Sequence, residues 1–156
     1  MGGINEIDIE RDERKEHHRL IFEEWLTTYK SYPNQKSTTK IINQERADKI
    51  VSYLINRELN PDPNSKFFVK QKGFNLVKIE DKEFLYRQKT EKSSNATINL
   101  PVAIKENFFD ILFNVHWIQR GHIGVDKTFH QIKVRYDGMP KPVICEFIKK
   151  CPICNL

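Results

Sequence analysis

The sequence predicts an α+β fold: a small helix-plus-three-stranded-sheet unit followed by a zinc-stabilised three-helix bundle. Three observations support this prediction. Apolar residues recur at helical spacing towards both ends of the chain, and short runs rich in aromatic and β-branched residues lie between them. A histidine pair and a cysteine pair also enclose the last predicted helices. At 156 residues the chain has room for one ordinary domain or two small ones.

The N-terminal third is expected to be helical after a charged lead-in. Residues 1–17 offer almost nothing apolar to bury, so we expect them to be disordered, with His17 and His18 solvated. A first helix is expected after Leu20, on the apolar stripe formed by Phe22, Trp25, Leu26 and Tyr29.

A second helix and a small sheet are expected next. The helix should run from about Gln44 to Leu59, with Asn43 as its N-cap. Three short runs, residues 67–71, 74–79 and 83–87, alternate in the manner of antiparallel strands. So small a sheet needs cover, and both preceding helices are expected to supply it. Residues 18–90 would then form one unit, and the polar residues 91–99 a linker.

The third part, residues 100–156, is predicted as three helices. The first opens at Leu100-Pro101, and the last two cover about Asp126–Tyr136 and Lys141–Lys150. Gly138 lies between these two helices, where it suits a left-handed C-cap. The apolar face of the first helix is formed by Ile104, Phe108, Ile111, Leu112 and Val115.

The chemistry-bearing residues of this part are His116, His122, Cys151 and Cys154. Two imidazoles and two thiols at the ends of a helical bundle are the donor set of a tetrahedral zinc site. Four protein ligands leave no open position for water, so one structural Zn²⁺ is expected, and no hydrolytic centre. The alternative is a histidine pair and a cysteine pair that lie apart at the surface. Redox chemistry is disfavoured because Cys151 ends a helix, where the dipole does not stabilise a thiolate.

The neighbouring residues receive ordinary structural interpretations. Cys145 and His130 are expected to be a packing residue and a surface residue, and Trp117 and Ile118 to cover the metal. A ββα finger is excluded, because it places its cysteines before its histidines.

The combined motif resembles a known family. His116, the run Gly121-His122-x-Gly124-x-x-Lys127-Thr128, Tyr136 and the Cys151-Pro-x-Cys154 knuckle together are similar to the His-His-Cys-Cys zinc-binding N-terminal domain of integrases. Such integrases occur in retroviruses, gypsy-type retrotransposons and related DNA transposons. The resemblance covers about residues 100–156, and it implies that Gly121 and Gly124 form the turn that aims His122.

The resemblance implies a non-catalytic region that serves multimerisation and DNA contact in DNA integration. The strand-transfer chemistry of the family belongs to an RNase H-like domain, which we expect outside this chain, so the chain itself is not expected to be an enzyme. The alternative is a domesticated protein–protein interaction module without DNA binding. The candidate DNA contacts are Lys127, Lys133, Arg135, Lys141, Lys149 and Lys150.

Charge and hydropathy bound the partners and the location. The formal net charge of +5 and a pI near 9.1 favour an anionic partner. No apolar run approaches the roughly 20 residues that span a bilayer, and no secretory signal is evident. We therefore expect a nuclear or cytoplasmic protein with DNA and protein partners, self-association included, and no small-molecule substrate.

Overall fold

The computed structural model describes residues 6–29, 41–55, 73–91, 93–119 and 122–154. The fold is α+β, as predicted, with a three-stranded antiparallel sheet. None of the described helices is both long and apolar enough to cross a membrane. The elements, in chain order, are α1 (Glu6–Thr28), α2 (Gln44–Ile55), β1 (Phe74–Ile79), β2 (Lys82–Thr90), β3 (Thr97–Pro101), the 3₁₀ turn η2 (Lys105–Asn107), α4 (Phe108–Phe113), the π-helical η3 (Asn114–Gln119), α5 (Val125–Lys133) and α6 (Lys141–Lys149).

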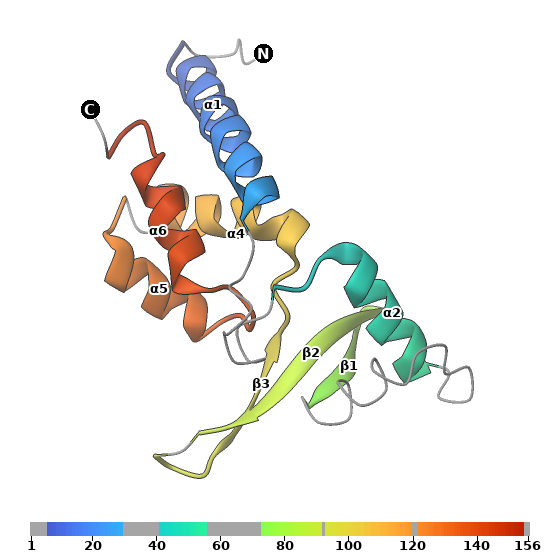
Figure 1. The fold of residues 1–156 in the computed structure, drawn as a ribbon. Coiled ribbons are helices and arrows are strands. Elements are labelled where there is room, and N and C mark those ends of the chain that lie inside the picture. The colour runs from blue at the N-terminus through green and yellow to red at the C-terminus, as the bar shows by residue number, and fades with distance from the viewer. Residues whose placement is uncertain (1–5, 30–40, 56–72, 92, 120–121, 155–156) are drawn as a thin grey trace.

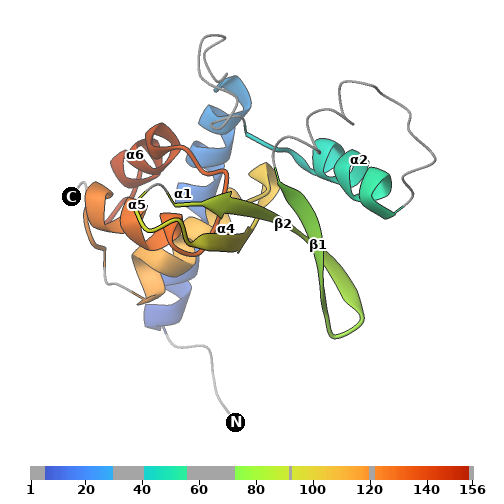
Figure 2. The same cartoon turned by 90° about the horizontal axis from the view of Figure 1, so that it is seen from below.

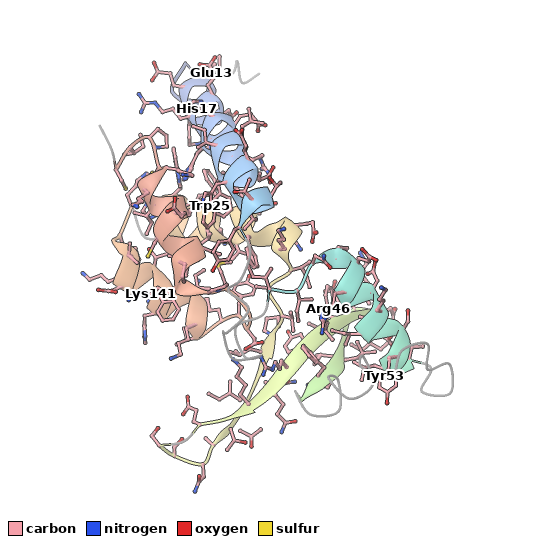
Figure 3. All side chains as sticks on the ribbon, viewed as in Figure 1. Glu13, His17, Trp25, Arg46, Tyr53 and Lys141 are labelled. Atoms are coloured by element: carbon pink, nitrogen blue, oxygen red, sulfur yellow. The ribbon has the colours of Figure 1, made fainter. Side chains whose placement is uncertain are left out.

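The described side chains form two hydrophobic cores. Figures 1 and 2 show the two groups of elements that surround them. The bundle core lies among α1, α4, α5 and α6, and its centre is the fully buried group Phe22, Phe108, Phe109 and Phe147. The sheet core lies between α2 and one face of the sheet, where Ile50 meets Phe74 and Leu85. Trp25 and Tyr53, labelled in Figure 3, belong to the bundle core and the sheet core respectively.

Helix α1 departs most from expectation. It begins at Glu6, so the prediction of disorder over residues 1–17 is wrong for residues 6–17. Ion pairs at helical spacing join Arg19 to Glu16 and Glu23, and they support a helix whose sequence is mostly charged. The helix packs on α4 and α6, not on the sheet, so α2 alone of the two expected cover helices packs on the sheet. Figure 2 shows α1 among the bundle helices and α2 next to β1.

Helix α2 follows the prediction at its start. The backbone N–H of Arg46 donates to the side-chain oxygen of Asn43 at 2.8 Å, which is the expected N-cap bond. Ala47 and Ile50 are buried against the sheet, as their spacing predicted.

The sheet has the order β1-β2-β3, with each neighbouring pair antiparallel. The expected strand at 67–71 lies outside the described residues. The third strand is β3, which occupies part of the expected linker 91–99 and the expected helix start at Leu100-Pro101. Residues 97–101 alternate polar and apolar side chains in strand fashion, and this pattern prevails over the helix-opening proline.

The two cores are joined by the segment that follows α5. Asp137 is buried, and it forms ion pairs with Arg87 (3.2 Å) and with Lys89 of β2. Its backbone also bonds to Pro101 and Ala103, so the loop extends the outer edge of β3. Gly138 has the positive φ (98°) expected of it. The division into units at 18–90 and 100–156 stays a prediction.

Candidate metal centre

The four predicted ligands come together at one end of the bundle core. His116 lies in η3, directly after α4, and His122 lies just before α5. Cys151 and Cys154 lie in the turn that follows α6. One donor atom from each side chain falls within 4.8 Å of the other three. This is the single such group of histidine, cysteine and acidic residues among the described parts of the chain.

Four of the six distances between donor atoms match the edges of a tetrahedron around zinc. With Zn–N bonds near 2.0 Å and Zn–S bonds near 2.3 Å, neighbouring ligand atoms are about 3.3–3.8 Å apart. The Nε2 atom of His116 lies 3.2 Å from Nδ1 of His122 and 3.3 Å from Sγ of Cys154. The Nδ1 atom of His122 lies 3.4 Å and 3.8 Å from the sulfurs of Cys151 and Cys154. The donor set and four of its six spacings therefore fit a tetrahedral zinc ion, and the remaining two pairs lie within 4.8 Å.

The environment keeps both imidazoles in the form that binds metal. His116 is fully buried, with its ring edge-on to Phe147 at 5.7 Å. Burial, followed by the neighbouring His122, lowers the pKa of His116 to about 4. Burial also lowers the pKa of His122. Both rings are therefore neutral near pH 7 and have a lone pair for a metal ion.

The pKa of the Cys154 thiol shifts in the opposite direction from those of the two histidines. Burial, with Cys151 nearby, raises the pKa of the Cys154 thiol to about 11. A dithiol catalyst needs a lowered pKa, so this environment opposes redox catalysis. A bound dication would displace the thiol protons, which couples metal affinity to pH. Cys145, the remaining cysteine, is half-buried on α6, and His130 is exposed on α5.

Backbone strain at His122 accompanies this geometry. His122 adopts φ 65°, in the left-handed region that side chains rarely enter, and its N–H donates to the His116 carbonyl. The resemblance implies that Gly121 and Gly124 form the turn that aims His122. Gly121 lies outside the described residues, whereas Gly124 has an ordinary φ of −69° as the N-cap of α5. The left-handed residue that aims the ligand is His122 itself.

Sequence reasoning missed His18, a buried residue next to the site. Its Nε2 lies 2.7 Å from the Phe147 carbonyl oxygen, and its Nδ1 accepts the indole N–H of Trp117 at 3.3 Å. Burial is the main reason that its pKa falls to about 4. The expectation that His18 is solvated is wrong. Trp117 lies with its ring centroid 4.8 Å from that of His122, consistent with the predicted cover over the metal, whereas Ile118 is exposed.

The six predicted DNA contacts lie on or next to α5 and α6, and several are paired with acidic residues. Lys141 lies 2.9 Å from Asp126, and Lys149 and Lys150 both approach Glu146. Lys141, labelled in Figure 3, also lines a cavity of about 860 Å³ with Lys133. Most residues of that cavity are apolar or already ion-paired. Lys127 is exposed and Arg135 half-buried, so the six residues do not form one unpaired basic surface.

Comparison with known proteins gives two relatives. No protein-family model matches the chain, and no solved structure matches it. Nucleolar protein 4 of Mus musculus and Nucleolar protein 4 of Homo sapiens are each 28% identical to it over 157 residues, which cover 86% of this chain. The chain spans about a third of the mouse protein and a quarter of the human one (32% and 24%).

These relatives overturn the integrase assignment. The proteins found are nucleolar proteins, not integrases, so the expected family is wrong. A role in DNA integration, an origin in a transposable element or its domesticated copy, and DNA as the partner lose their support with it. The candidate metal centre does not depend on that resemblance, because the four donor atoms lie close together in the fold.

Proposed function

We propose that this chain is a non-catalytic, zinc-stabilised module that contacts RNA in the nucleolus. The observation that carries the proposal is the convergence of two imidazole nitrogens and two sulfurs at tetrahedral spacing. A site with four protein ligands has no position left for a reacting water, and such sites are structural. His116, His122, Cys151 and Cys154 would hold one Zn²⁺ and fix the end of α6 to η3.

RNA as the partner rests on charge and on the relatives. The chain has a net charge of +5, which favours a polyanion. The relatives are named for the nucleolus, an RNA-rich compartment inside the nucleus. Nuclear location and RNA contact are thus carried over to this chain as parts of the proposal. Protein partners, self-association included, stay a prediction that light scattering at several concentrations tests.

The metal half of the proposal is tested by native mass spectrometry. We expect one zinc per folded chain, and we expect Cys154→Ser to lose it because a hydroxyl is a poor substitute for a thiolate ligand. The matched control is Cys145→Ser, which removes the third cysteine from α6, away from the donor cluster, and should keep the zinc. A folded, metal-free wild-type chain in zinc-containing buffer contradicts the proposal.

The RNA half is tested by fluorescence anisotropy with labelled single-stranded RNA. Binding should weaken as salt rises, because lysine and arginine contacts release counterions from the phosphates. Absence of binding at low salt, or binding without a salt dependence, would remove RNA contact from the function.

A further inference from the structure

The two faces of the sheet differ in cover. Side chains alternate along each strand, and the register places Phe74, Leu85 and Val102 on the face that packs under α2. The opposite face, which we call the open face, consists of Asn75, Val77 and Ile79 of β1, the even-numbered residues of β2 and the odd-numbered residues of β3. Asn75 and Asn99 hydrogen-bond through their side chains at 2.8 and 3.1 Å, which confirms that they share this face.

The open face is more apolar than a solvated sheet face usually is. Phe84 and Ile79 are 43% and 44% exposed, and Tyr86 and Val77 are partly exposed. None of these four side chains belongs to, or packs against, either core in the described part of the chain. An antiparallel sheet with one buried face normally carries polar residues on the other. A cluster of exposed aromatic and branched side chains marks a binding surface.

The charge of the open face indicates what kind of partner it suits. Its strand residues include one lysine, Lys82, and no carboxylate, whereas Glu83 points to the other face and Glu80 and Asp81 lie in the turn beyond the strands. Its remaining polar groups are amides and hydroxyls, such as Asn75, Asn99 and Tyr86. A surface of aromatic rings, amides and a cation without acidic groups is complementary to an anionic ligand that has planar, hydrogen-bonding parts.

We propose that the open face binds single-stranded RNA, with bases stacked on Phe84 and Tyr86. This inference rests on the proposed function and locates it. The two rings are two residues apart on one strand, so their Cα atoms lie about 7 Å apart and successive unstacked nucleotides can each reach one ring. Aromatic side chains on a sheet face are a general platform for single-stranded RNA, since every base has a π-face.

Neighbouring groups complete the surface. Asn75 is directly opposite Tyr86 across β1 and β2, and its side-chain oxygen, which accepts one bond from Asn99, can accept a second from the edge of a base stacked on that ring. Lys82 supplies a cation for the phosphate backbone at the β1–β2 end. Bases inside a duplex are already stacked and paired, so double-stranded RNA of the same sequence should bind weakly to this face.

The test uses the full zinc-loaded chain and fluorescein-labelled single-stranded RNA, with the duplex form as comparison. Phe84→Ala and Tyr86→Ala should each weaken binding of the single strand about tenfold or more, which is the usual loss for one stacked base. The control variant is Ile55→Ala, which removes another exposed apolar side chain (63% exposed) on α2 and should leave affinity unchanged. Urea unfolding of each variant checks that the fold is intact.

A second experiment tests base stacking without shortening the side chain at position 84. Phe84→Trp keeps an aromatic ring at the position, so affinity should be retained, and stacking of a base should quench the fluorescence of the new indole. Quenching by the single strand but not by the duplex supports the proposal, and an unchanged emission spectrum contradicts it.

The outcomes separate this inference from the function on which it rests. Binding of RNA by wild type, with no loss in Phe84→Ala or Tyr86→Ala, overturns the open face as the site and leaves RNA contact standing. No binding of any RNA by wild type removes the function and the inference together. If sedimentation shows a dimer that Phe84→Ala dissociates while RNA affinity stays the same, the open face is a protein interface and the proposal fails.

Discussion

His18 is the residue whose burial against the bundle core is most unexpected. It is fully buried, both ring nitrogens have partners, and its ring lies 4.1 Å from that of Phe147, centroid to centroid. It thus joins α1 to η3, which contains His116, and to α6, which is followed by the turn with Cys151 and Cys154. A buried group with both hydrogen bonds satisfied fixes one arrangement of these elements, because any other leaves a polar nitrogen unpaired.

We predict that His18 makes the chain sensitive to mild acid. Its pKa is about 4 in the folded chain and 6.5 when exposed, so between these values the unfolded chain binds a proton that the folded chain does not. The stability that His18 contributes is therefore complete above pH 6.5 and falls by about 3 kcal/mol as the pH drops to 4. Urea unfolding at a series of pH values measures this loss.

The control for that experiment is His18→Gln, whose amide can donate to the Phe147 carbonyl and accept from Trp117 but does not titrate. The variant should lose less stability than wild type over the same pH range, because the acid sensitivity of His116 and His122 is common to both proteins. Parallel pH profiles would mean that His18 contributes nothing to the acid sensitivity.

At this scale the sequence predicted which four donor groups would come together and missed their surroundings. The four donors were identifiable because His-x5-His and Cys-x2-Cys are local spacings at helix ends. His18 was not, since it follows His17 in a charged run and its burial depends on contacts more than 90 residues away. The left-handed conformation of His122 has no local signal either, because only a few per cent of non-glycine residues adopt it.

At the scale of elements, the start of the sheet depends on one glycine. Gly73 has φ 74°, and a Cβ atom there would lie 2.5 Å from the backbone oxygen of Gln88 on β2. The N–H of Gln88 also donates to the Gly73 carbonyl, so the two backbones are held together. A side chain therefore meets both an unfavourable φ and a steric clash that only a backbone shift relieves.

We predict that Gly73→Ala destabilises the chain by about 1–3 kcal/mol through this strain. The matched control is Gly124→Ala, because Gly124 has φ −69° and a Cβ there would meet no atom within 4 Å. Gly124→Ala should lower the free energy of unfolding by at most a few tenths of a kcal/mol, because its only effect is a weaker N-cap. Midpoints of urea unfolding for the two variants measure the difference. Equal midpoints would contradict the assigned role of Gly73.

Helices and strands with a strong local sequence pattern were easier to predict than those with an ambiguous one. The strands at residues 74–79 and 82–90 and the helix at 141–149 have strong periodicity and short, clear boundaries, and they lie where the sequence predicted. The strand β3 was missed because Leu100-Pro101 also reads as a helix start. Pairing with β2, a contact that no local window contains, decides between the two.

At the scale of the whole molecule, the sequence did not indicate which of the two cores each helix would join. The spacing of Phe22, Trp25 and Leu26 predicted a helix with an apolar stripe, yet it did not say which surface the stripe would cover. The structure places α1 on α4 and α6 and leaves α2 with the sheet (Figure 1). Aromatic content favours this partition, because Phe22 meets the rings of Phe109 and Phe147 in the bundle core.

The partition predicts that metal removal affects the two cores unequally. All four donors belong to segments of the bundle, and Cys151 is fully buried beneath the end of α6. The sheet core has no metal ligand, and its contacts are those of α2 with the strands. A bound zinc would therefore stabilise the bundle directly, while the sheet would depend on it through the Asp137 segment and through residues 41–42 and 102–105, which also join the two cores.

We expect chelation of the zinc-loaded chain to expose the amides of α5 and α6 to hydrogen exchange, while amides in the centre of β2 keep most of their protection. Exchange measured by mass spectrometry before and after addition of a chelator gives the comparison within one molecule. Cys154→Ser should reproduce the chelated pattern without a chelator, and Cys145→Ser should not. A uniform loss of protection across both cores would show that the molecule unfolds as one unit. In that case the ion pairs of Asp137 with Arg87 and Lys89 would couple the sheet to the metal as strongly as the bundle is coupled.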